Sequence, residues 1–228
     1  MKVKLYLLPG TQSNEKLWEK LLSESNHQFE FIQLAIPIAA DFNELIEKII
    51  AKLPDERINL LGFSLGGYLA AHIAMIHPER VSRLMVIANS PCQLNAHELI
   101  QLQQVLNFIE QFGYNGMGYK KAASMVDDAQ VHADVIDTLL QMDAKLGKTT
   151  LVNQLEITSY REDLALPLSK LTMPISFYYS EADSLINKTW INGLSKHQHI
   201  SVYCTSGKGH MLPLEKPKEL LRVIEQWV

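Results

Sequence analysis

The chain has 228 residues, of which 47% are hydrophobic and 20% charged, and its formal net charge at pH 7 is −4. This composition excludes a disordered chain, and the slight acidity gives no reason to expect nucleic acid or an anionic membrane surface as a partner. Two cysteines cannot supply a disulfide framework or a zinc site with four thiolate ligands, and no apolar stretch reaches the ~18–20 residues of a membrane span.

Short apolar runs bounded by turn residues alternate with helical patterns in the first part of the chain. Runs of this kind are typical of strands buried on both faces of a parallel sheet. We predict strands at residues 3–8, 29–36, 58–63 and 81–88. Between them, apolar residues recur on one helix face over residues 42–53. Segment 65–76 is apolar on nearly all sides, which predicts a buried helix.

The middle of the chain has a different pattern. Residues 92–166 contain no proline and no alternating apolar pattern, whereas apolar residues recur at helical spacing within 99–109 and 131–140. We therefore predict that residues 92–166 form a helical cap insertion of three or four helices. It would separate a first part of the core, residues 1–91, from a second part, residues 167–228.

The alternation of strands and helices returns in the last part of the chain. Two more strands are predicted at residues 175–179 and 200–204, with a helix face at residues 186–194 between them and a last helix over residues 220–228. Such a series favours an α/β fold, with a mostly parallel sheet of about six strands flanked by helices on both sides.

The most informative motif is Gly62-x-Ser64-x-Gly66, which comes directly after a predicted strand and directly before a predicted helix. A serine on such a sharp turn is exposed at the carboxyl edge of the sheet, and the residues two before and two after it collide unless they are glycines. The N-terminus of the following helix directs free N–H groups to the same point, where they stabilise an oxyanion. A simple glycine-rich turn is the alternative. A phosphate-binding loop is disfavoured because no Lys-Ser or Lys-Thr pair follows the glycines.

A serine hydroxyl needs a base, and His210 is the best placed of the eight histidines because it follows the last predicted strand. Asp183 follows the preceding strand and would orient the imidazole, with Glu181 as the rival acid. The order serine, aspartate, histidine is the one expected for a hydrolase whose serine lies on a strand-to-helix turn. His72 and His77 are expected to pack or cap the helix after the serine. The histidines expected to face solvent are His27, His97, His132, His197 and His199.

Two backbone N–H groups are predicted to form an oxyanion hole. The helix start supplies the N–H of Leu65, and the loop after the first strand supplies the N–H of Thr11. Gly10 in that loop permits close approach of the backbone to a ligand. The residues expected to line a substrate pocket are Gly10, Phe63, Tyr114, Met117, Tyr119, Met125 and Met211. Ordinary core packing is the alternative role for the aromatic and methionine side chains.

In these features the chain resembles the α/β-hydrolase superfamily, and most of all its capped branch of carboxylesterases, enol-lactonases and C–C hydrolases. The resemblance rests on residues 7–10, 62–67, 77–81, 171–175 and 209–217. The chain differs from the family pattern at Pro9, where a histidine is usual, and at Ser180, where a glycine is usual.

The resemblance implies an α/β-hydrolase fold and a serine hydrolase with a small-molecule substrate. Its expected reaction is cleavage of a small ester through an acyl-enzyme, with the triad Ser64, Asp183 and His210 and with no metal or organic cofactor. The same triad could serve a thioesterase, a lactonase, a C–C hydrolase or lyase, an aminopeptidase or an acyl-transferase. The fold could also be kept as a small-molecule receptor without turnover. Because the sequence has no signal-peptide pattern, we expect a cytoplasmic protein. We expect it to be either a monomer or a homodimer.

Overall fold

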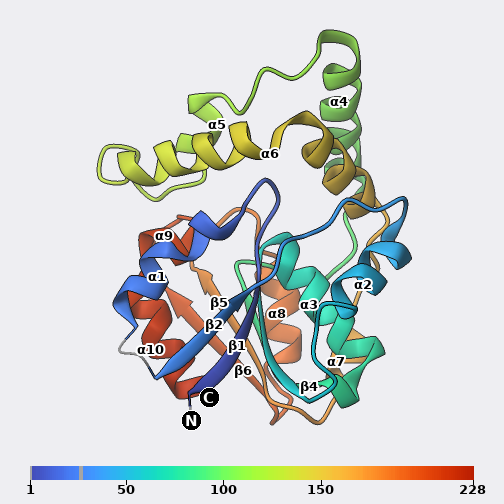
Figure 1. The fold of residues 1–228 in the computed structure, drawn as a ribbon, viewed down its shortest axis with the longest axis vertical. Coiled ribbons are helices and arrows are strands. Elements are labelled where there is room, and N and C mark those ends of the chain that lie inside the picture. Colours follow the sequence, from blue (N-terminus) through green and yellow to red (C-terminus); the bar gives the residue numbers. More distant parts are fainter. Residues whose placement is uncertain (1, 26–27) are drawn as a thin grey trace.

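The computed structural model describes residues 2–25 and 28–228, which are built around one six-stranded sheet (Figure 1). The strands are β1 (Val3–Leu8), β2 (Phe29–Gln33), β3 (Ile58–Phe63), β4 (Val81–Ile87), β5 (Ile175–Ser180) and β6 (Ile200–Thr205). Their order is β2-β1-β3-β4-β5-β6, and every neighbouring pair is parallel. The predicted α/β fold with a parallel sheet of about six strands is confirmed. Only β2 is clearly shorter than predicted, since it ends at Gln33 instead of residue 36.

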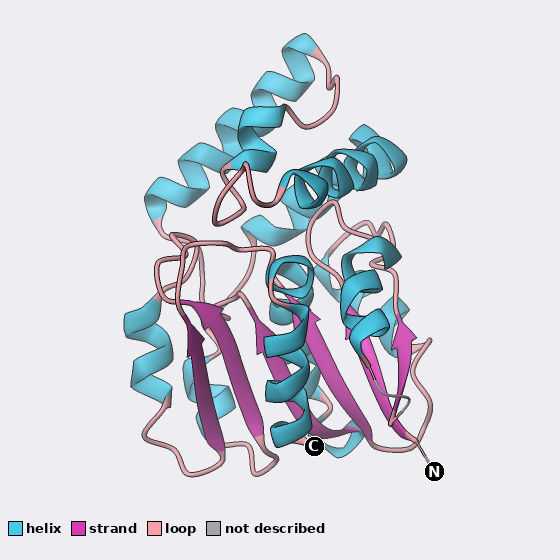
Figure 2. Cartoon of the chain, turned by 90° about the vertical axis from the view of Figure 1, so that its left-hand side faces the viewer, coloured by secondary structure: helices cyan, strands magenta, loops and turns pink. Residues whose placement is uncertain are grey.

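Helices cover both faces of this sheet (Figures 1 and 2). The helices on one face are α2 (Phe42–Ile50), α3 (Leu65–Ile76) and α8 (Lys188–Leu194), and those on the other are α1 (Glu19–Glu24), α9 (Leu212–Glu215) and α10 (Pro217–Trp227). Two 3-10 helices, Glu15–Trp18 and Pro78–Arg80, precede α1 and β4. Neighbouring residues of one strand enter opposite cores: Leu60 packs with α3, and Leu61 packs in the cluster that contains α10. The strands are therefore apolar without alternation, as a sheet buried on both faces requires.

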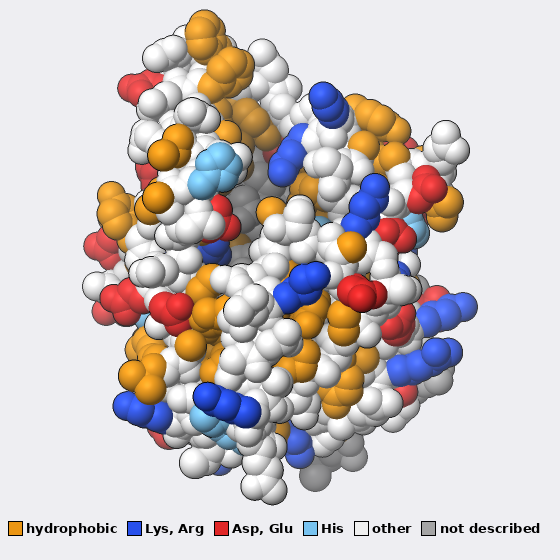
Figure 3. Space-filling view, turned by 180° about the vertical axis from the view of Figure 1, so that it is seen from behind, with side chains coloured by type: hydrophobic (Ala, Val, Ile, Leu, Met, Phe, Trp, Pro, Cys, Tyr) orange, Lys and Arg blue, Asp and Glu red, His pale blue; other side chains and the backbone are white. Residues whose placement is uncertain are grey.

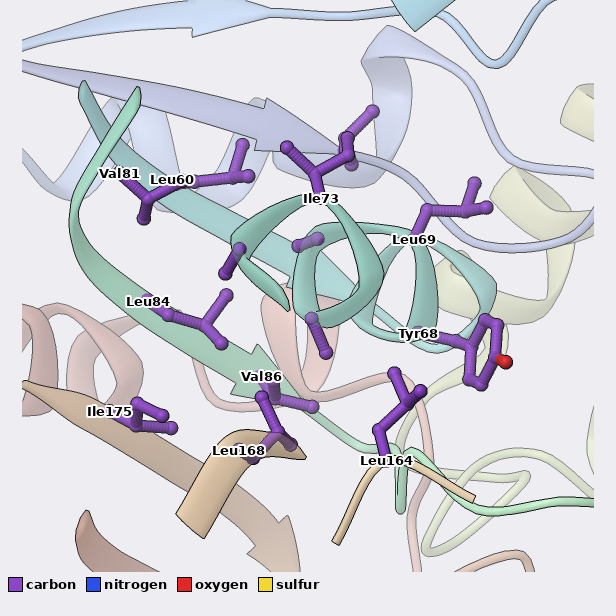
Figure 4. Close-up of a cluster of buried hydrophobic side chains, with 14 of the residues drawn as sticks. Leu60, Tyr68, Leu69, Ile73, Val81, Leu84, Val86, Leu164, Leu168 and Ile175 are labelled. Carbon is purple, nitrogen blue, oxygen red and sulfur yellow. The ribbon is translucent and has the colours of Figure 1, made fainter. Parts of the chain in front are cut away.

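The central helix α3 is buried, as its sequence predicts. Figure 4 shows Ile73 of this helix close to Leu60 of β3, and Leu60, Leu69, Ile73 and the β4 residue Val86 are all fully buried. This packing against β3 and β4 fixes where the helix begins, and with it the turn that carries Ser64.

Ser64 occupies the turn between β3 and α3, with φ 51° and ψ −119°. A Cβ on Gly62 would lie 2.0 Å from the carbonyl oxygen of Gly66, and a Cβ on Gly66 would lie 2.3 Å from the carbonyl oxygens of Leu8 and Pro9. Because these neighbours are backbone atoms, they cannot rotate aside. Both glycines are therefore needed, because a side chain at either position would collide with the backbone of the turn.

Replacing Gly66 by alanine is expected to lower the free energy of unfolding by roughly 3 kcal/mol or more, because the added methyl group would collide with the backbone at the end of β1. Urea denaturation measures this change. Gly193→Ala, in α8, is the matched control, since its added Cβ would meet nothing within 4 Å. Equal stability of the two variants would contradict the account of the turn.

The helices between β4 and β5 are α4 (Ala96–Phe112), α5 (Tyr119–Ala123), α6 (Ala133–Ser159) and α7 (Ala165–Ser169). The first three lie over the carboxyl ends of the strands (Figure 2), and we refer to them as the cap. Gly147 interrupts α6 with φ 71° and ψ −174°, so this helix consists of two helical stretches. Leu168 of α7 belongs instead to the apolar cluster around α3. The predicted boundary at residue 166 thus falls inside a helix that packs on the core.

The surface carries mixed charges. On the face shown in Figure 3, acidic and basic side chains are interspersed among apolar ones, in keeping with the small net charge. None of the helices in the described residues is both long and apolar enough to cross a membrane.

Candidate active site

The side chains of Ser64, His210 and Asp183 meet at the carboxyl edge of the sheet. Ser64 Oγ lies 3.1 Å from His210 Nε2, and His210 Nδ1 lies 2.7 Å from Asp183 Oδ2. The three residues follow β3, β6 and β5, which end at one edge because the strands are parallel. His210 is 3% exposed and Asp183 is 4% exposed. The serine hydroxyl can donate to Nε2 while the Nδ1–H group donates to the carboxylate, and this arrangement can move a proton away from the serine.

Asp183, and not its rival Glu181, is the carboxylate in contact with His210. The second oxygen of Asp183 accepts a hydrogen bond from the Leu185 N–H at 3.0 Å, which fixes the carboxyl group. Glu181 is exposed, and its backbone N–H donates to the Thr205 carbonyl. The tight turn after β5 therefore directs one acidic side chain inward and leaves the other in solvent.

Three contacts hold the loop that carries His210. The His210 N–H donates to the Met125 carbonyl at 2.8 Å, and the imidazole lies against the Phe63 ring, with 5.2 Å between ring centroids. The Ser180 hydroxyl donates to the Gly209 carbonyl, so the serine that replaces the usual glycine stabilises this loop directly. These contacts limit how far the imidazole can move from the serine.

Glu215 is a further support of this loop, and sequence reasoning missed its role. Its buried carboxylate accepts from the Met211 N–H at 2.9 Å and from the Asp127 N–H at 2.6 Å. Burial raises the pKa of Glu215, because the charged form loses its hydration. A Cβ on Gly209 would lie 2.3 Å from this carboxylate, which explains the glycine before His210. The motif 215–217 was visible in the sequence, but nothing there showed that the carboxylate turns inward.

Among the described residues, the only histidine in hydrogen-bond contact with the serine hydroxyl is His210. The His72 ring packs edge-on against Phe42, and His77 ends α3 and contacts Glu79. Of the five expected to face solvent, His97 is exposed, whereas His132, His197 and His199 are partly buried and His27 lies outside the described residues.

The backbone N–H groups of Thr11 and Leu65 remain the predicted donors of the oxyanion hole. Within the part of the chain that the structure describes, neither group donates to a protein acceptor. Thr11 and Ser64 line the same cavity, and Leu65 is the first residue of α3. The positive end of the helix dipole and a free N–H group thus lie beside the serine.

A cavity of about 480 Å³ opens over Ser64 and His210. Five of the seven predicted pocket residues line it: Phe63, Tyr114, Met117, Met125 and Met211. Tyr119 does not, because α5 directs this side chain outward and leaves it 59% exposed. Gly10 does not line the cavity either, because it lies beneath the Phe63 ring, where an added Cβ would come within 2.9 Å of a ring carbon.

Sequence reasoning missed four apolar residues of the cavity wall. The additional apolar side chains are Val105, Leu151, Leu155 and Leu185, and the polar or charged ones are Gln12, Ser13, Lys121 and Asp143. Val105, Leu151 and Leu155 come from α4 and α6, so the cap forms much of the cavity wall. Among residues 2–25 and 28–228, no group of three or more His, Cys, Asp or Glu side chains is arranged to hold a metal ion.

Comparison with known proteins shows to which family the chain belongs. A family model described as the alpha/beta hydrolase fold matches residues 8–126. A thermophilic esterase from Thermogutta terrifontis has a similar structure, with a TM-score of 0.86 and 17% identity, over 100% of this chain and 89% of that chain. A hydrolase from Pseudomonas aeruginosa PA01 has a TM-score of 0.83 and 16% identity, over 99% of this chain and 89% of that chain.

An enol-lactonase from Burkholderia xenovorans LB400 is also similar, with a TM-score of 0.80 and 12% identity, over 100% of this chain and 91% of that chain. At these identities the solved structures share the fold with this chain. The family model covers more than half of the 228 residues and includes the turn that carries Ser64. The chain therefore belongs to the α/β-hydrolase fold family.

Proposed function

We propose that this protein is a serine hydrolase that cleaves a small-molecule ester by acyl transfer to water. The observation that carries the proposal is the continuous chain of contacts from Ser64 Oγ through the His210 ring to Asp183, at the floor of a cavity. Family membership and the similarity to an esterase and an enol-lactonase support a hydrolase.

The proposed reaction has two steps. In the first, Ser64 Oγ bonds to the ester carbonyl carbon while its proton passes to His210 Nε2, and the Thr11 and Leu65 N–H groups stabilise the tetrahedral oxyanion. The intermediate collapses, and His210 returns the proton to the departing alcohol. In the second step a water molecule, deprotonated by His210, attacks the acyl-enzyme. The intermediate collapses, the bond to Ser64 Oγ breaks, and His210 returns the proton to Ser64 Oγ, which releases the acid and restores the enzyme. Asp183 keeps the imidazole oriented and stabilises its protonated form.

The cavity favours a small, weakly polar substrate. Its walls are mostly apolar, and Met117, Met125 and Met211 line it together with Ser64. Apolar walls bind an acyl or alkyl group by removing its surface from water. One cationic side chain, Lys121, also lines the cavity.

The proposal is tested by a panel of 4-nitrophenyl esters, thioesters, lactones and aminoacyl anilides, with Ser64→Ala as the blank. We expect the highest kcat/KM with short-chain esters. Higher kcat/KM with another class would assign the triad to that class instead. No turnover above the blank with any of them would contradict a hydrolase and favour a receptor.

Asp183→Asn is expected to reduce kcat by roughly 10⁴-fold, and by less than removal of the serine or the histidine, because the base remains but its orientation and charge stabilisation are weakened. Ester hydrolysis measures this effect. Glu181→Gln is the control and should retain the wild-type rate, since this carboxylate is exposed. The reverse order of the two effects would mean that Asp183 is not the orienting acid.

A further inference from the structure

We propose that Asp143, a buried carboxylate on the cap helix α6, is a positioning residue for the oxyanion hole. It acts through the side chain of Gln12 and so holds the loop that carries the Thr11 N–H. This inference rests on the proposed hydrolase function, because it assigns a role in stabilising the oxyanion formed on Ser64.

Asp143 is 1% exposed and is surrounded by hydrogen-bond donors. Its Oδ1 accepts from Gln12 Nε2 at 2.9 Å and from the Tyr114 hydroxyl, and its Oδ2 accepts from the Met117 N–H at 2.7 Å. Within the described residues, no Lys, Arg or His nitrogen lies within ion-pair distance of this carboxylate. A buried carboxylate without a cation is costly unless its oxygens are hydrogen-bonded, so displacement of these donors is opposed.

Tyr114 remains a donor in this cluster. Burial raises the pKa of its hydroxyl, and the neighbouring Asp143 carboxylate raises that pKa further. The Tyr114 proton therefore stays in place across the pH range in which ester hydrolysis is measured. As a result, the carboxylate and its donors form a stable connection between the cap and the loop after β1.

The conformation of Gln12 shows why this connection matters for Thr11. The Ser13 N–H donates to the Gly10 carbonyl at 3.2 Å, which closes a four-residue turn with Gln12 in its third position. Gln12 has φ 51°, a value that glycine or asparagine normally supplies at this position of a turn. Such a conformation is strained in other residues and persists only when surrounding contacts hold it.

The contacts that hold Gln12 come from α6. Its Nε2 donates to Asp143 and to the Gly147 carbonyl at 3.2 Å, and its backbone N–H donates to Gln154 Oε1 at 2.9 Å. All of these acceptors lie in α6, more than 130 residues away along the chain. A glycine would adopt the turn without strain but could not form the side-chain contacts. We infer that a glutamine stands here because it ties the turn, and with it the Thr11 N–H, to the cap.

The cap therefore has two roles: it forms much of the cavity wall, and its helix α6 holds the loop after β1. Contacts on both sides hold the loop that carries the Thr11 N–H. Gly10 packs against Phe63 and Ser64 of the core, and Gln12 is hydrogen-bonded to α6 of the cap. Displacing a donor by a fraction of an ångström weakens oxyanion stabilisation while substrate binding is little affected. The alternative is that the cluster only docks the cap on the core.

Matched oxygen and sulfur substrates separate the two roles. The sulfur anion formed from a thionoester is a weaker hydrogen-bond acceptor than the oxyanion formed from an ester, so an intact oxyanion hole favours the ester. We propose to measure kcat/KM with 4-nitrophenyl acetate and its thiono analogue, for the wild type, Asp143→Asn and Gln12→Gly. Asp143→Asn keeps the side-chain volume but replaces one acceptor by a donor, and Gln12→Gly keeps the turn but removes the contact.

We expect both variants to lose roughly 10- to 100-fold in kcat on the ester with little change in KM, and to show an ester-to-thionoester ratio about tenfold below that of the wild type. Asp137→Asn, an exposed carboxylate on the same helix, should keep the wild-type ratio. Gln12→Gly has no strain at this turn, so it tests the inference even if Asp143→Asn fails to fold.

A wild-type ratio in folded Gln12→Gly would overturn the positioning role and leave the proposed hydrolase function intact. So would equal losses on the ester and the thionoester, since a structural defect affects both alike. A wild type that hydrolyses no ester of the panel above the Ser64→Ala blank would overturn both the proposed function and this inference.

Discussion

Replacement of Ser64 by alanine is expected to reduce kcat on a chromogenic ester by on the order of 10⁴-fold or more, with the protein still folded. The substitution removes one oxygen atom, whose contact is His210 Nε2. The backbone of the turn is retained, because the Ser64 carbonyl still accepts from the Gly67 and Tyr68 N–H groups at the start of α3. The loss should therefore appear in catalysis and hardly in stability.

Initial rates and urea denaturation of the same preparation check this expectation. Ser195→Ala, which removes an exposed hydroxyl at the end of α8, is the matched control and should match the wild type in both measurements. A Ser64→Ala protein that retains normal turnover would exclude this serine as the nucleophile.

Replacement of His210 by alanine should cost a comparable factor, because no base then accepts the serine proton. This variant should also be less stable. It removes a buried ring that packs on Phe63, and it leaves the Asp183 carboxylate buried without its partner, at a cost of about 1–3 kcal/mol or more. The double variant His210→Ala/Asp183→Asn removes the unpaired charge as well. It should recover part of the stability and none of the activity.

Residues that act as one unit have non-additive effects, so the double variant should be about as inactive as His210→Ala alone. His97→Ala, an exposed position in α4, is the control for loss of a histidine. An unchanged rate in His210→Ala would move the role of base to another residue. Multiplicative losses in the double variant would mean that His210 and Asp183 act independently.

Much of the frame that holds the site follows from the sequence. Strands β1 and β3 have the predicted limits, because an apolar run bounded by turn residues defines a doubly buried strand well. Once the strands are placed in a parallel sheet, their carboxyl ends share one edge. The proximity of Ser64, Asp183 and His210 then follows from their positions after three strands.

Short elements were beyond sequence reasoning. The helix α1 (Glu19–Glu24) and the 3-10 helix before it give too few turns for a periodic pattern to show. Their apolar side chains Leu17, Trp18 and Leu21 are nevertheless buried in the same cluster as Phe63. Long-range packing, not local preference, determines these helices.

The cap shows a second limit, which is the direction of side chains. Its helices could be predicted from apolar spacing, but the rotation of α5 could not, and Tyr119 faces solvent for that reason. Asp143 differs in the opposite direction, since its side chain is buried although it is charged. A charged residue within a helix is normally expected at the surface, and its burial depends on Gln12, which is distant in the sequence.

The most direct test of the central claim is covalent labelling with a fluorophosphonate, followed by mass spectrometry of the digested protein. We predict one phosphonyl adduct, located on Ser64, in the native protein, with no labelling after heat denaturation and strongly slowed labelling in His210→Ala. An adduct on a different residue, or a native protein that the reagent leaves unmodified, would contradict the account.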